Sequence, residues 1–453
     1  MKTVSIDVQD FIDQQRISAF QWRVFVLCFL ADAIDGIDIG IVAYIAPSLR
    51  HEWGLTVTQI SPIFVSSLIG MMFGSLVFGP MADRYGRRPV LMISVAFFGM
   101  ATLLALLASN VTEFAALRFI AGMGIGGASP MAVTMTAEYA PLRKRLTLIT
   151  AMMCGNSMGS ALGGVIASSV IPRFGWHAML LVGGLMPVAL IPILWFFLPE
   201  SLRFVALRRA DRQDLMRGLA RRIAPMQVVE GSVFIAQETK VQRFAVAELL
   251  TPTYRVGTLL LWTTFFMGLS VLFLMASWLP TLITHSGGSM KSAALTTALW
   301  SIGGTVGGLL LGRLMDLSFP TRVLGIAYAV GCVLTYCVGQ FYTMPAILGP
   351  LAFAAGFCIS GSQVGVNGIA ATFYPTAMRA TGVAWATGIG RMGSILGSAV
   401  GGLLISSGMA YGTLFTIVAI PALIAAICII SISKVRIPAW QTQTSAPASD
   451  VRL

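Results

Sequence analysis

The sequence predicts an all-α polytopic membrane protein with twelve transmembrane helices in two halves of six. Hydrophobic residues make up 56% of the 453 residues, and charged residues make up only 11%. Apolar runs of about 20 residues recur along most of the chain, and each is long enough to cross a hydrocarbon core of about 30 Å as a helix. A soluble protein of this length would carry about twice this density of charge.

The predicted spans follow the apolar runs in chain order. They are residues 22–47, 59–80, 89–108, 113–135, 147–170, 176–198, 255–280, 293–312, 321–341, 346–369, 380–406 and 411–433. One polar, Arg-rich stretch interrupts the pattern and predicts a cytoplasmic linker with short helical pieces. The domain limits we expect are an N-terminal six-helix bundle at 1–200, the linker at 201–254, a C-terminal bundle at 255–433 and a cytoplasmic tail at 434–453.

The net charge of +12 is explained by membrane topology. If the N-terminus lies inside, only Arg50, Arg173 and Lys291 among the Lys and Arg residues fall in outer loops. This positive-inside bias places both termini in the cytoplasm. We therefore expect contact with the lipid bilayer and no nucleic acid partner.

Four residues near the second span return near the eighth, which predicts an internal repeat. Gly70, Gly74, Gly79 and Asp83 recur as Gly303, Gly307, Gly312 and Asp316, always 233 residues later. Glycines at four-residue spacing let helix backbones approach closely. Two parallel six-helix repeats are the design of the major facilitator fold.

The loop after the second span reads G-P-M-A-D-R-Y-G-R-R. It resembles the loop signature G-x-x-x-D-R-x-G-R-R of the major facilitator superfamily. The resemblance implies a cytoplasmic gate or latch built from Gly79, Asp83, Arg84, Gly86, Arg87 and Arg88. The alternative is an ordinary positive-inside loop. The second copy keeps Asp316 but lacks the paired arginines, so we expect its latch to be weaker or asymmetric.

Two acids close to this loop are further gating candidates. Glu138 ends the fourth span ahead of a basic run and is expected to join the network of Asp83 and Arg87. A solvated helix-end acid is the alternative. Glu200 lies in P-E-S-L-R, which resembles the end of the sixth span in several facilitator families, and is expected to serve in gating or positioning.

Three aspartates, Asp32, Asp35 and Asp38, interrupt the first span as D-A-I-D-G-I-D. Each carboxylate at the centre of a span costs roughly 2.5–3.5 kcal/mol on insertion scales. A spacing of three residues places them on one stripe of a helix. We expect this stripe to face a wet cavity and to bind protons, while Gly36 allows a neighbouring backbone to approach.

Two arginines inside spans are the expected partners of these acids. Arg118 begins R-F-I-A-G-M-G, which resembles a further motif of the superfamily, and is expected to pair with the aspartates; snorkelling to the outer interface is the alternative. Arg391 lies about 15 Å into its span, near the midplane. Its expected partner is Asp35, Asp38 or a substrate carboxylate, with a purely structural ion pair as the alternative.

The run from Asp35 to Pro47 is similar to the first span of the aromatic acid:proton symporter family, which shows D-G-x-D there. The resemblance covers nearly the whole chain. It implies uptake of benzoate-like acids with protons across the bacterial inner membrane. The family's functional positions correspond to Asp35, Asp38, Asp83, Arg118, Arg379 and Arg391, and Asp32 lies outside that pattern.

An aromatic acid needs one cation and an apolar slot. Arg391 is the expected cation, Phe265, Phe266 and Trp385 are candidate walls, and Gln363 and Asn367 are candidate partners for a ring hydroxyl. Core packing, an interfacial aromatic belt and helix–helix contacts are the alternatives for these side chains. We expect no metal and no cofactor other than the proton, and a monomer that functions alone.

Two other functions fit parts of the pattern. A proton-driven efflux antiporter for drugs or aromatic compounds would also use acids within the membrane. A receptor that kept the fold without transport is the second rival. An enzyme is not expected, because no metal-ligand, nucleophile–base or phosphate-loop pattern is present.

Overall fold

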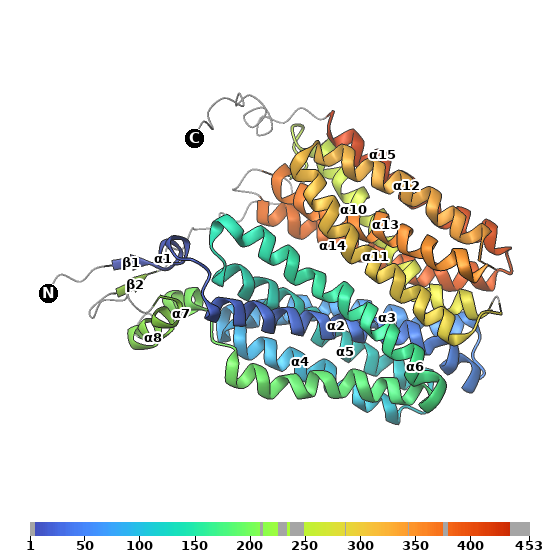
Figure 1. Ribbon diagram of the computed structural model, residues 1–453, viewed down its shortest axis with the longest axis horizontal. Helices are drawn as coiled ribbons and strands as arrows, with labels where there is room; N and C mark the ends of the chain where they lie inside the picture. Colours follow the sequence, from blue (N-terminus) through green and yellow to red (C-terminus); the bar gives the residue numbers. More distant parts are fainter. Residues whose placement is uncertain are drawn as a thin grey trace. The chain divides into compact units, whose positions relative to one another are not determined.

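The computed structural model describes residues 5–208, 212–224, 233–235, 249–285, 287–342, 344–374 and 379–434. Its elements are shown in Figure 1. They are β1 (Ser5–Asp7), α1 (Val8–Gln14), α2 (Ala19–Glu52), α3 (Val57–Tyr85), α4 (Arg87–Leu104), η1 (Ala105–Leu107), α5 (Val111–Tyr139), α6 (Leu142–Phe197), α7 (Leu202–Arg208), α8 (Gln213–Ile223), β2 (Val233–Ile235), α10 (Arg255–His285), α11 (Met290–Leu317), α12 (Pro320–Gln340), α13 (Pro345–Phe373), α14 (Arg379–Ser406) and α15 (Tyr411–Ile432).

All twelve predicted spans are present as helices. Within the described ranges, ten helices are long and apolar enough to cross a membrane. The three aspartates of α2 keep it out of that set, although its 34 residues exceed the length of a span. Helix α6 contains two spans, because Gly175 at φ 78° and ψ 174° interrupts its helical backbone. The predicted all-α membrane fold of twelve helices is therefore confirmed.

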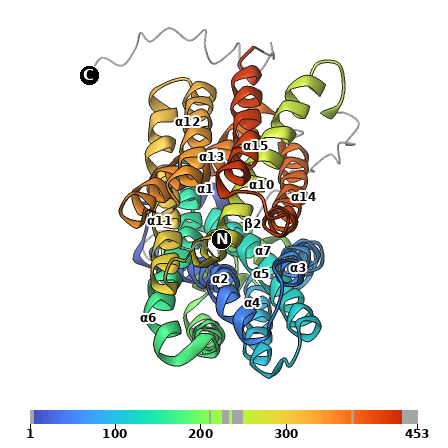
Figure 2. The same cartoon turned by 90° about the vertical axis from the view of Figure 1, so that its right-hand side faces the viewer.

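Contacts divide the chain into two compact units. The first unit holds Met1–Thr239 and Pro280–Ala298, and the second holds Lys240–Leu279 and Leu299–Leu453. The domain limits expected from the sequence stay a prediction, and the expected tail lies outside the described residues apart from Lys434. In the second unit, α12 packs against both α13 and α15, which lie together in Figure 2.

Glycines bring α3 and α5 of the first unit into backbone contact. A Cβ atom on Gly70 or Gly74 would overlap a main-chain carbonyl oxygen of α5, and one on Gly122 or Gly126 would overlap a carbonyl oxygen of α3. Only glycine fits at these four positions. Four-residue spacing on both helices makes this a close crossing of the small-residue type.

The second unit repeats this crossing between α11 and α13. A Cβ atom on Gly303 would overlap the carbonyl oxygen of Phe353, and one on Gly307 would overlap that of Phe357. These glycines are the repeats of Gly70 and Gly74. The internal repeat seen in the sequence therefore corresponds to the same helix packing in each unit.

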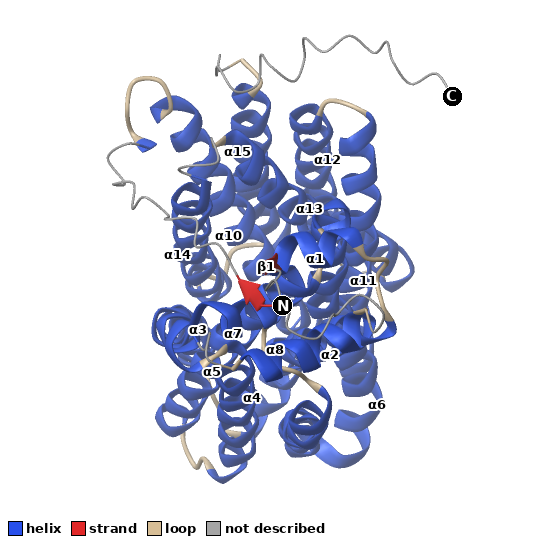
Figure 3. Ribbon diagram, turned by 90° about the vertical axis from the view of Figure 1, so that its left-hand side faces the viewer, coloured by secondary structure: helices blue, strands red, loops and turns tan. Residues whose placement is uncertain are grey.

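A small module outside the helix bundle joins the N-terminal segment to the linker. Strands β1 and β2 pair in parallel, with Ser5 opposite Val233. The rings of Phe11 and Phe234 pack edge-on, with their centres 5.5 Å apart. Figure 1 shows α1, β1, β2, α7 and α8 gathered at one end of the first unit's helices, and Figure 3 shows β1 as a strand among helices. The linker was expected to hold short helical pieces, which α7 and α8 are, whereas strand β2 was not expected.

The module also contacts the start of α6. The carboxylate of Asp13 accepts the main-chain N–H of Leu142 at 2.6 Å, and Arg143 Nη2 donates to the carbonyl oxygen of Gln15 at 2.6 Å. Pro141, the N-cap residue of α6, has no side-chain cap of its own. Asp13 therefore acts as a helix cap supplied from another part of the chain, where a negative charge is favourable.

Candidate functional site

The acidic stripe of α2 lies in the interior of the first unit. Asp32 is 2% exposed, and Asp35 and Asp38 are fully buried. Each is separated from the next by three residues, so consecutive carboxyl groups lie about one helical turn apart. The structure gives the three groups different surroundings.

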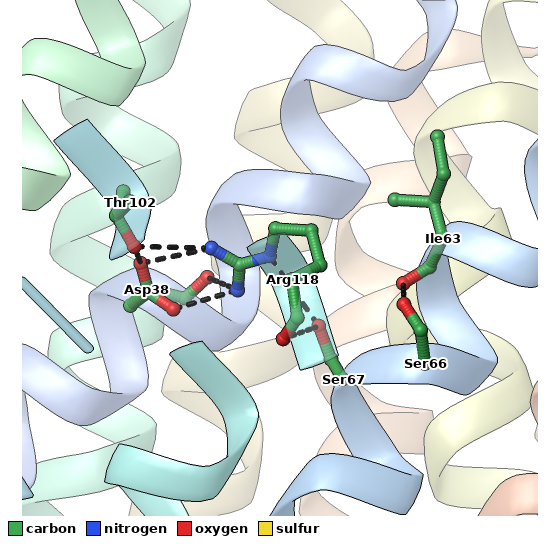
Figure 4. A network of polar contacts seen from close by, with 6 residues as sticks. All are labelled: Asp38, Ile63, Ser66, Ser67, Thr102 and Arg118. Atoms are coloured by element: carbon green, nitrogen blue, oxygen red, sulfur yellow. Dashed lines mark hydrogen bonds and ion pairs between the residues drawn. The ribbon is translucent and has the colours of Figure 1, made fainter. Parts of the chain in front are cut away.

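Asp38 forms an ion pair with Arg118 of α5 (Figure 4). Arg118 Nη2 lies 2.6 Å from Asp38 Oδ2, and Nη1 donates to Oδ1 at 3.2 Å. Both side chains are buried, and a guanidinium that bonds two carboxylate oxygens gives a directional contact. The expected pairing of Arg118 with a span aspartate is present, and Arg118 does not snorkel to an interface.

Two hydroxyl groups complete this pair. Thr102 of α4 donates to Asp38 Oδ1 at 2.7 Å and accepts from Arg118 Nη1 at 3.2 Å. Arg118 Nε donates to the hydroxyl of Ser67 on α3 at 3.3 Å (Figure 4). The ion pair is therefore bonded from α2, α3, α4 and α5. The sequence analysis missed Thr102 and Ser67, because single hydroxyls in apolar spans are too common to signal a role.

Asp35 has no comparable partners. Among the residues that the structure describes, no hydrogen-bond partner reaches either of its carboxyl oxygens, and the side chain is fully buried. An ionised carboxylate in such surroundings has lost its water without any compensating donor, which is costly. The surroundings of Asp35 suit a carboxyl group that binds a proton.

Asp32 has two donors from two other helices. Its Oδ1 accepts from the Ser129 hydroxyl on α5 at 3.0 Å, and its Oδ2 accepts from the main-chain N–H of Asn156 on α6 at 3.0 Å. A Cβ atom on Gly36 would overlap the carbonyl oxygen of the same Asn156. The close backbone approach expected at Gly36 is therefore confirmed.

The signature segment was expected to be a loop, but its residues 79–85 lie in α3 and Arg87 already begins α4; the carboxylate of Glu200, which follows α6, holds the junction. Glu200 Oε1 accepts the main-chain N–H groups of Arg87 at 3.0 Å and of Arg88 at 3.3 Å. These N–H groups open α4 and have no partner within the helix, so an acid there is favourable by about 0.3–1 kcal/mol. Sequence reasoning singled out Glu200 but not this bonding.

Arg87 connects the loop to the fourth span. Its Nη2 lies 3.5 Å from Glu138 Oε1, and its guanidinium lies 5.2 Å from the centre of the Phe204 ring. The exposed fractions of the Arg87 and Glu138 side chains are 14% and 10%, so Glu138 is not a solvated helix-end acid. The expected contact of Glu138 with Arg87 is present, and its role in gating stays a prediction.

The two glycines of the signature segment, Gly79 inside α3 and Gly86 at its end, differ in what surrounds them. Gly86 adopts φ 113°, and a Cβ atom there would overlap the Glu200 carboxylate. A Cβ atom on Gly79 would meet no atom within 4 Å. Arg84 lies over the Tyr85 ring, and Arg88 donates to the carbonyl oxygen of Trp195. The side chains of Asp83, Asp316 and Arg379, which were expected to serve in gating, lie outside the described set.

Three polar substrate candidates lie in the second unit. Arg391 is partly buried in α14. Gln363 of α13 is 7% exposed and accepts from the Tyr328 hydroxyl at 3.0 Å, while Asn367 Nδ2 donates to the main-chain oxygen of Gln363 at 3.0 Å. The bond of Gln363 joins α13 to α12 and matches the helix-contact alternative, whereas the bond of Asn367 lies within α13; the substrate role of both amides stays a prediction.

The aromatic candidates have contrasting positions. Phe265 is 1% exposed and belongs to the hydrophobic core of the second unit, whereas Phe266 is partly buried. Trp385 is 45% exposed, and its ring stacks on Trp262 with centres 6.0 Å apart. Phe265 therefore packs in the core in this conformation, and Trp385 presents the more open aromatic surface.

Comparison with known proteins gives a consistent result. A family model described as Major Facilitator Superfamily matches residues 28–347 and 287–449. The gallate transporter of Pseudomonas putida is 43% identical over 441 residues, which is 97% of this chain and 98% of that protein. The 4-hydroxybenzoate transporter PcaK of Pseudomonas aeruginosa is 43% identical over 422 residues, which is 93% of this chain and 94% of that protein.

Solved structures extend the likeness to the fold. A D-xylose-proton symporter superposes with a TM-score of 0.71 over 93% of this chain and 99% of that chain. The two sequences are 19% identical. At this level of identity, the likeness concerns the fold alone.

Proposed function

Since this chain belongs to the Major Facilitator Superfamily, we propose that it is a proton-coupled symporter that imports an aromatic carboxylate by alternating access. It is a transporter and not an enzyme. The two relatives named above, a gallate transporter and a 4-hydroxybenzoate transporter, support an aromatic acid as the substrate.

The observation that carries the proposal is the contrast between Asp35 and Asp38. Asp38 is bonded by Arg118 and Thr102, whereas Asp35 is fully buried and no hydrogen-bond partner in the described chain reaches its carboxyl group. A carboxyl group that is buried without compensating donors favours the neutral form, whereas Arg118 and Thr102 compensate the carboxyl group of Asp38. Asp35 is the proton carrier in this scheme.

Arg391 is the proposed anchor for the substrate carboxylate. It lies nine residues beyond Gly382, where a candidate span begins, which is roughly 14 Å along a helix. Guanidinium groups bind carboxylates through two parallel hydrogen bonds. In this scheme a proton from outside binds to Asp35, and the substrate carboxylate binds to Arg391. The protein then changes from an outward-open to an inward-open conformation. The proton and the substrate are released into the cytoplasm.

The orientation in the membrane follows from the charges of the sequence. Among the Lys and Arg residues, only Arg50, Arg173 and Lys291 fall in the predicted outer loops, which favours both termini in the cytoplasm. We place the protein in a bacterial inner membrane as a functional monomer. The proton is the coupling ion, and no other cofactor takes part.

The test is uptake into proteoliposomes with an imposed proton gradient. Labelled 4-hydroxybenzoate, gallate and benzoate are offered to liposomes whose exterior is more acidic than the lumen. We expect at least one acid to accumulate above its external concentration and a protonophore to abolish the accumulation. Export of the acid driven by an inward proton gradient would show that the protein is an antiporter. Flux that does not respond to the gradient would show that transport is not coupled to protons.

A further inference from the structure

Asp32 takes no part in the scheme above, although it lies one turn from the proton carrier. It is buried among three helices, and both of its oxygens are bonded. Ser129 of α5 donates to Oδ1, and the main chain of Asn156 in α6 donates to Oδ2, each at 3.0 Å. A carboxylate that receives bonds from two neighbouring helices ties them to its own.

The contact between α2 and α6 at Asn156 also involves Gly36. Asp32 and Gly36 are four residues apart and therefore share one face of α2. Asp32 takes the N–H of Asn156, and Gly36 makes room for the carbonyl oxygen of Asn156. One turn of α2 therefore accepts the N–H of Asn156 and lies in close contact with its carbonyl oxygen.

The backbones of α2 and α6 are in close contact at this level. A Cβ atom on Gly159 would overlap the carbonyl oxygen of Ala33, and one on Gly155 would lie 2.8 Å from that of Phe29. The bond from Asp32 to the main-chain N–H of Asn156 links α2 to α6 at this level, and the Tyr44 hydroxyl, which donates to the main-chain oxygen of Ser160 at 2.8 Å, links them further along.

We propose that Asp32 is a positioning residue, which locks α2 against α5 and α6 one turn from Asp35 and carries no transported proton. The proposal rests on the proposed symport function. It assigns the three aspartates three tasks: Asp35 carries the proton, Asp38 balances Arg118, and Asp32 fixes the helix on which both lie.

The chemistry of the donors explains why this task needs no negative charge. A main-chain N–H can only donate, and an amide oxygen accepts it as well as a carboxylate oxygen does. The Ser129 hydroxyl can accept as well as donate. Asparagine at position 32 can therefore keep both contacts, with its oxygen toward Asn156 and its NH₂ group toward Ser129.

The first test compares Asp32→Asn, Asp32→Ala, Ser129→Ala and Asp35→Asn in proteoliposomes. We expect Asp32→Asn to keep proton-driven uptake within about twofold of the wild type, because both hydrogen bonds survive. Asp32→Ala is expected to lower the maximal rate about tenfold or more while KM changes less than about twofold, since the substrate site is untouched. Ser129→Ala should fall between them.

Two results of the uptake experiment would contradict the role proposed for Asp32. If Asp32→Asn inserts normally but is as inactive as Asp35→Asn, then Asp32 needs its charge and is a proton site. If Asp32→Ala raises KM and leaves the maximal rate unchanged, Asp32 belongs to the substrate site. Either result leaves the proposed symport function standing.

The second test does not depend on transport. Hydrogen exchange of the purified protein reports on the main-chain amide of Asn156. We expect exchange there to be about tenfold faster or more in Asp32→Ala than in the wild type, and close to wild type in Asp32→Asn. Equal exchange in all three proteins would refute the lock. If the wild type transports no aromatic acid, the proposed function fails, and exchange still decides whether Asp32 joins the helices.

Discussion

Arg118 and Asp38 neutralise each other inside the first unit, with Arg118 Nη2 2.6 Å from Asp38 Oδ2 and both side chains buried. Neither can be removed alone without leaving a buried charge. We expect Arg118→Ala to lower the free energy of unfolding by about 3–5 kcal/mol, the usual cost of an uncompensated buried ion. Thermal unfolding in detergent, followed by tryptophan fluorescence, measures this loss.

The matched control is the double variant Arg118→Ala/Asp38→Asn. It removes both charges, so it should be more stable than Arg118→Ala alone. A double variant as unstable as the sum of both single changes would mean that the two residues act independently.

Asp35→Asn should separate substrate movement from proton movement. The amide has the shape of the protonated acid, so the protein is expected to insert and to exchange labelled substrate between the two sides of the membrane. Accumulation driven by a proton gradient should be lost, because asparagine cannot release a proton. Counterflow and gradient-driven uptake in the same proteoliposomes distinguish the two activities. Normal accumulation would remove Asp35 from the coupling step.

Arg391→Ala should weaken substrate binding. A hydrogen bond to a charged group is worth about 1.5–3 kcal/mol, which corresponds to a rise in KM of roughly 10–150-fold. The dependence of uptake on substrate concentration gives KM directly. A neutral methyl ester of the substrate is the control, since it should not compete with the acid in the wild type. An unchanged KM in Arg391→Ala would place the carboxylate elsewhere.

Gly86→Ala and Gly79→Ala form a contrasting pair within the signature segment, since Gly86 is the C-cap residue of α3 whereas Gly79 lies inside that helix. Gly86 has φ 113° and faces the Glu200 carboxylate, whereas Gly79 has open space around its Cα atom. We expect Gly86→Ala to destabilise the protein by more than 1 kcal/mol, roughly the cost of the backbone strain alone. Gly79→Ala should keep or raise the melting temperature of the wild type, because alanine favours a helix and its Cβ atom meets no other atom there. Equal melting temperatures for both variants would contradict the described contact of Glu200.

Asp13→Ala should loosen the start of α6. The loss of a helix cap costs about 1 kcal/mol, and the effect should be local. Hydrogen exchange at the main-chain amide of Leu142, which Asp13 holds at 2.6 Å, is the direct measurement. Asp10→Ala is the control, because Asp10 is an exposed acid on the same short helix. Equal exchange in the two variants would mean that the cap contributes nothing.

The parts of the site that the sequence predicted are those where burial leaves few choices. A charge inside an apolar span favours a partner, so the sequence predicted the pairing of Arg118 with an aspartate, with snorkelling as the alternative. The sequence did not say which aspartate, because three acids on one helical stripe are equivalent until α4 and α5 are placed. Thr102 selects Asp38, and that contact joins residues distant in the chain.

Other features carried too little local pattern. Strands of three residues, such as β1 and β2, have no readable alternation and form only because they pair with each other. Aromatic residues in spans occur in the core, against lipid and in cavities. For this reason the sequence analysis named both Phe265 and Trp385 as candidate walls of the substrate slot, although their exposed fractions differ. Glu200 was noticed through its motif, but the helix that it caps could come only from the fold.

The β1–β2 pairing also constrains the order of assembly. It joins residue 5 to residue 233, so the first strand must wait until the whole of α2 to α6 has been synthesised. Both strands must then be on the same side of the membrane, which requires an even number of crossings between them. A chain that misthreads one helix would leave β1 and β2 on opposite sides, unable to meet. The small sheet can therefore form only when the spans between its two strands have inserted with an even number of crossings.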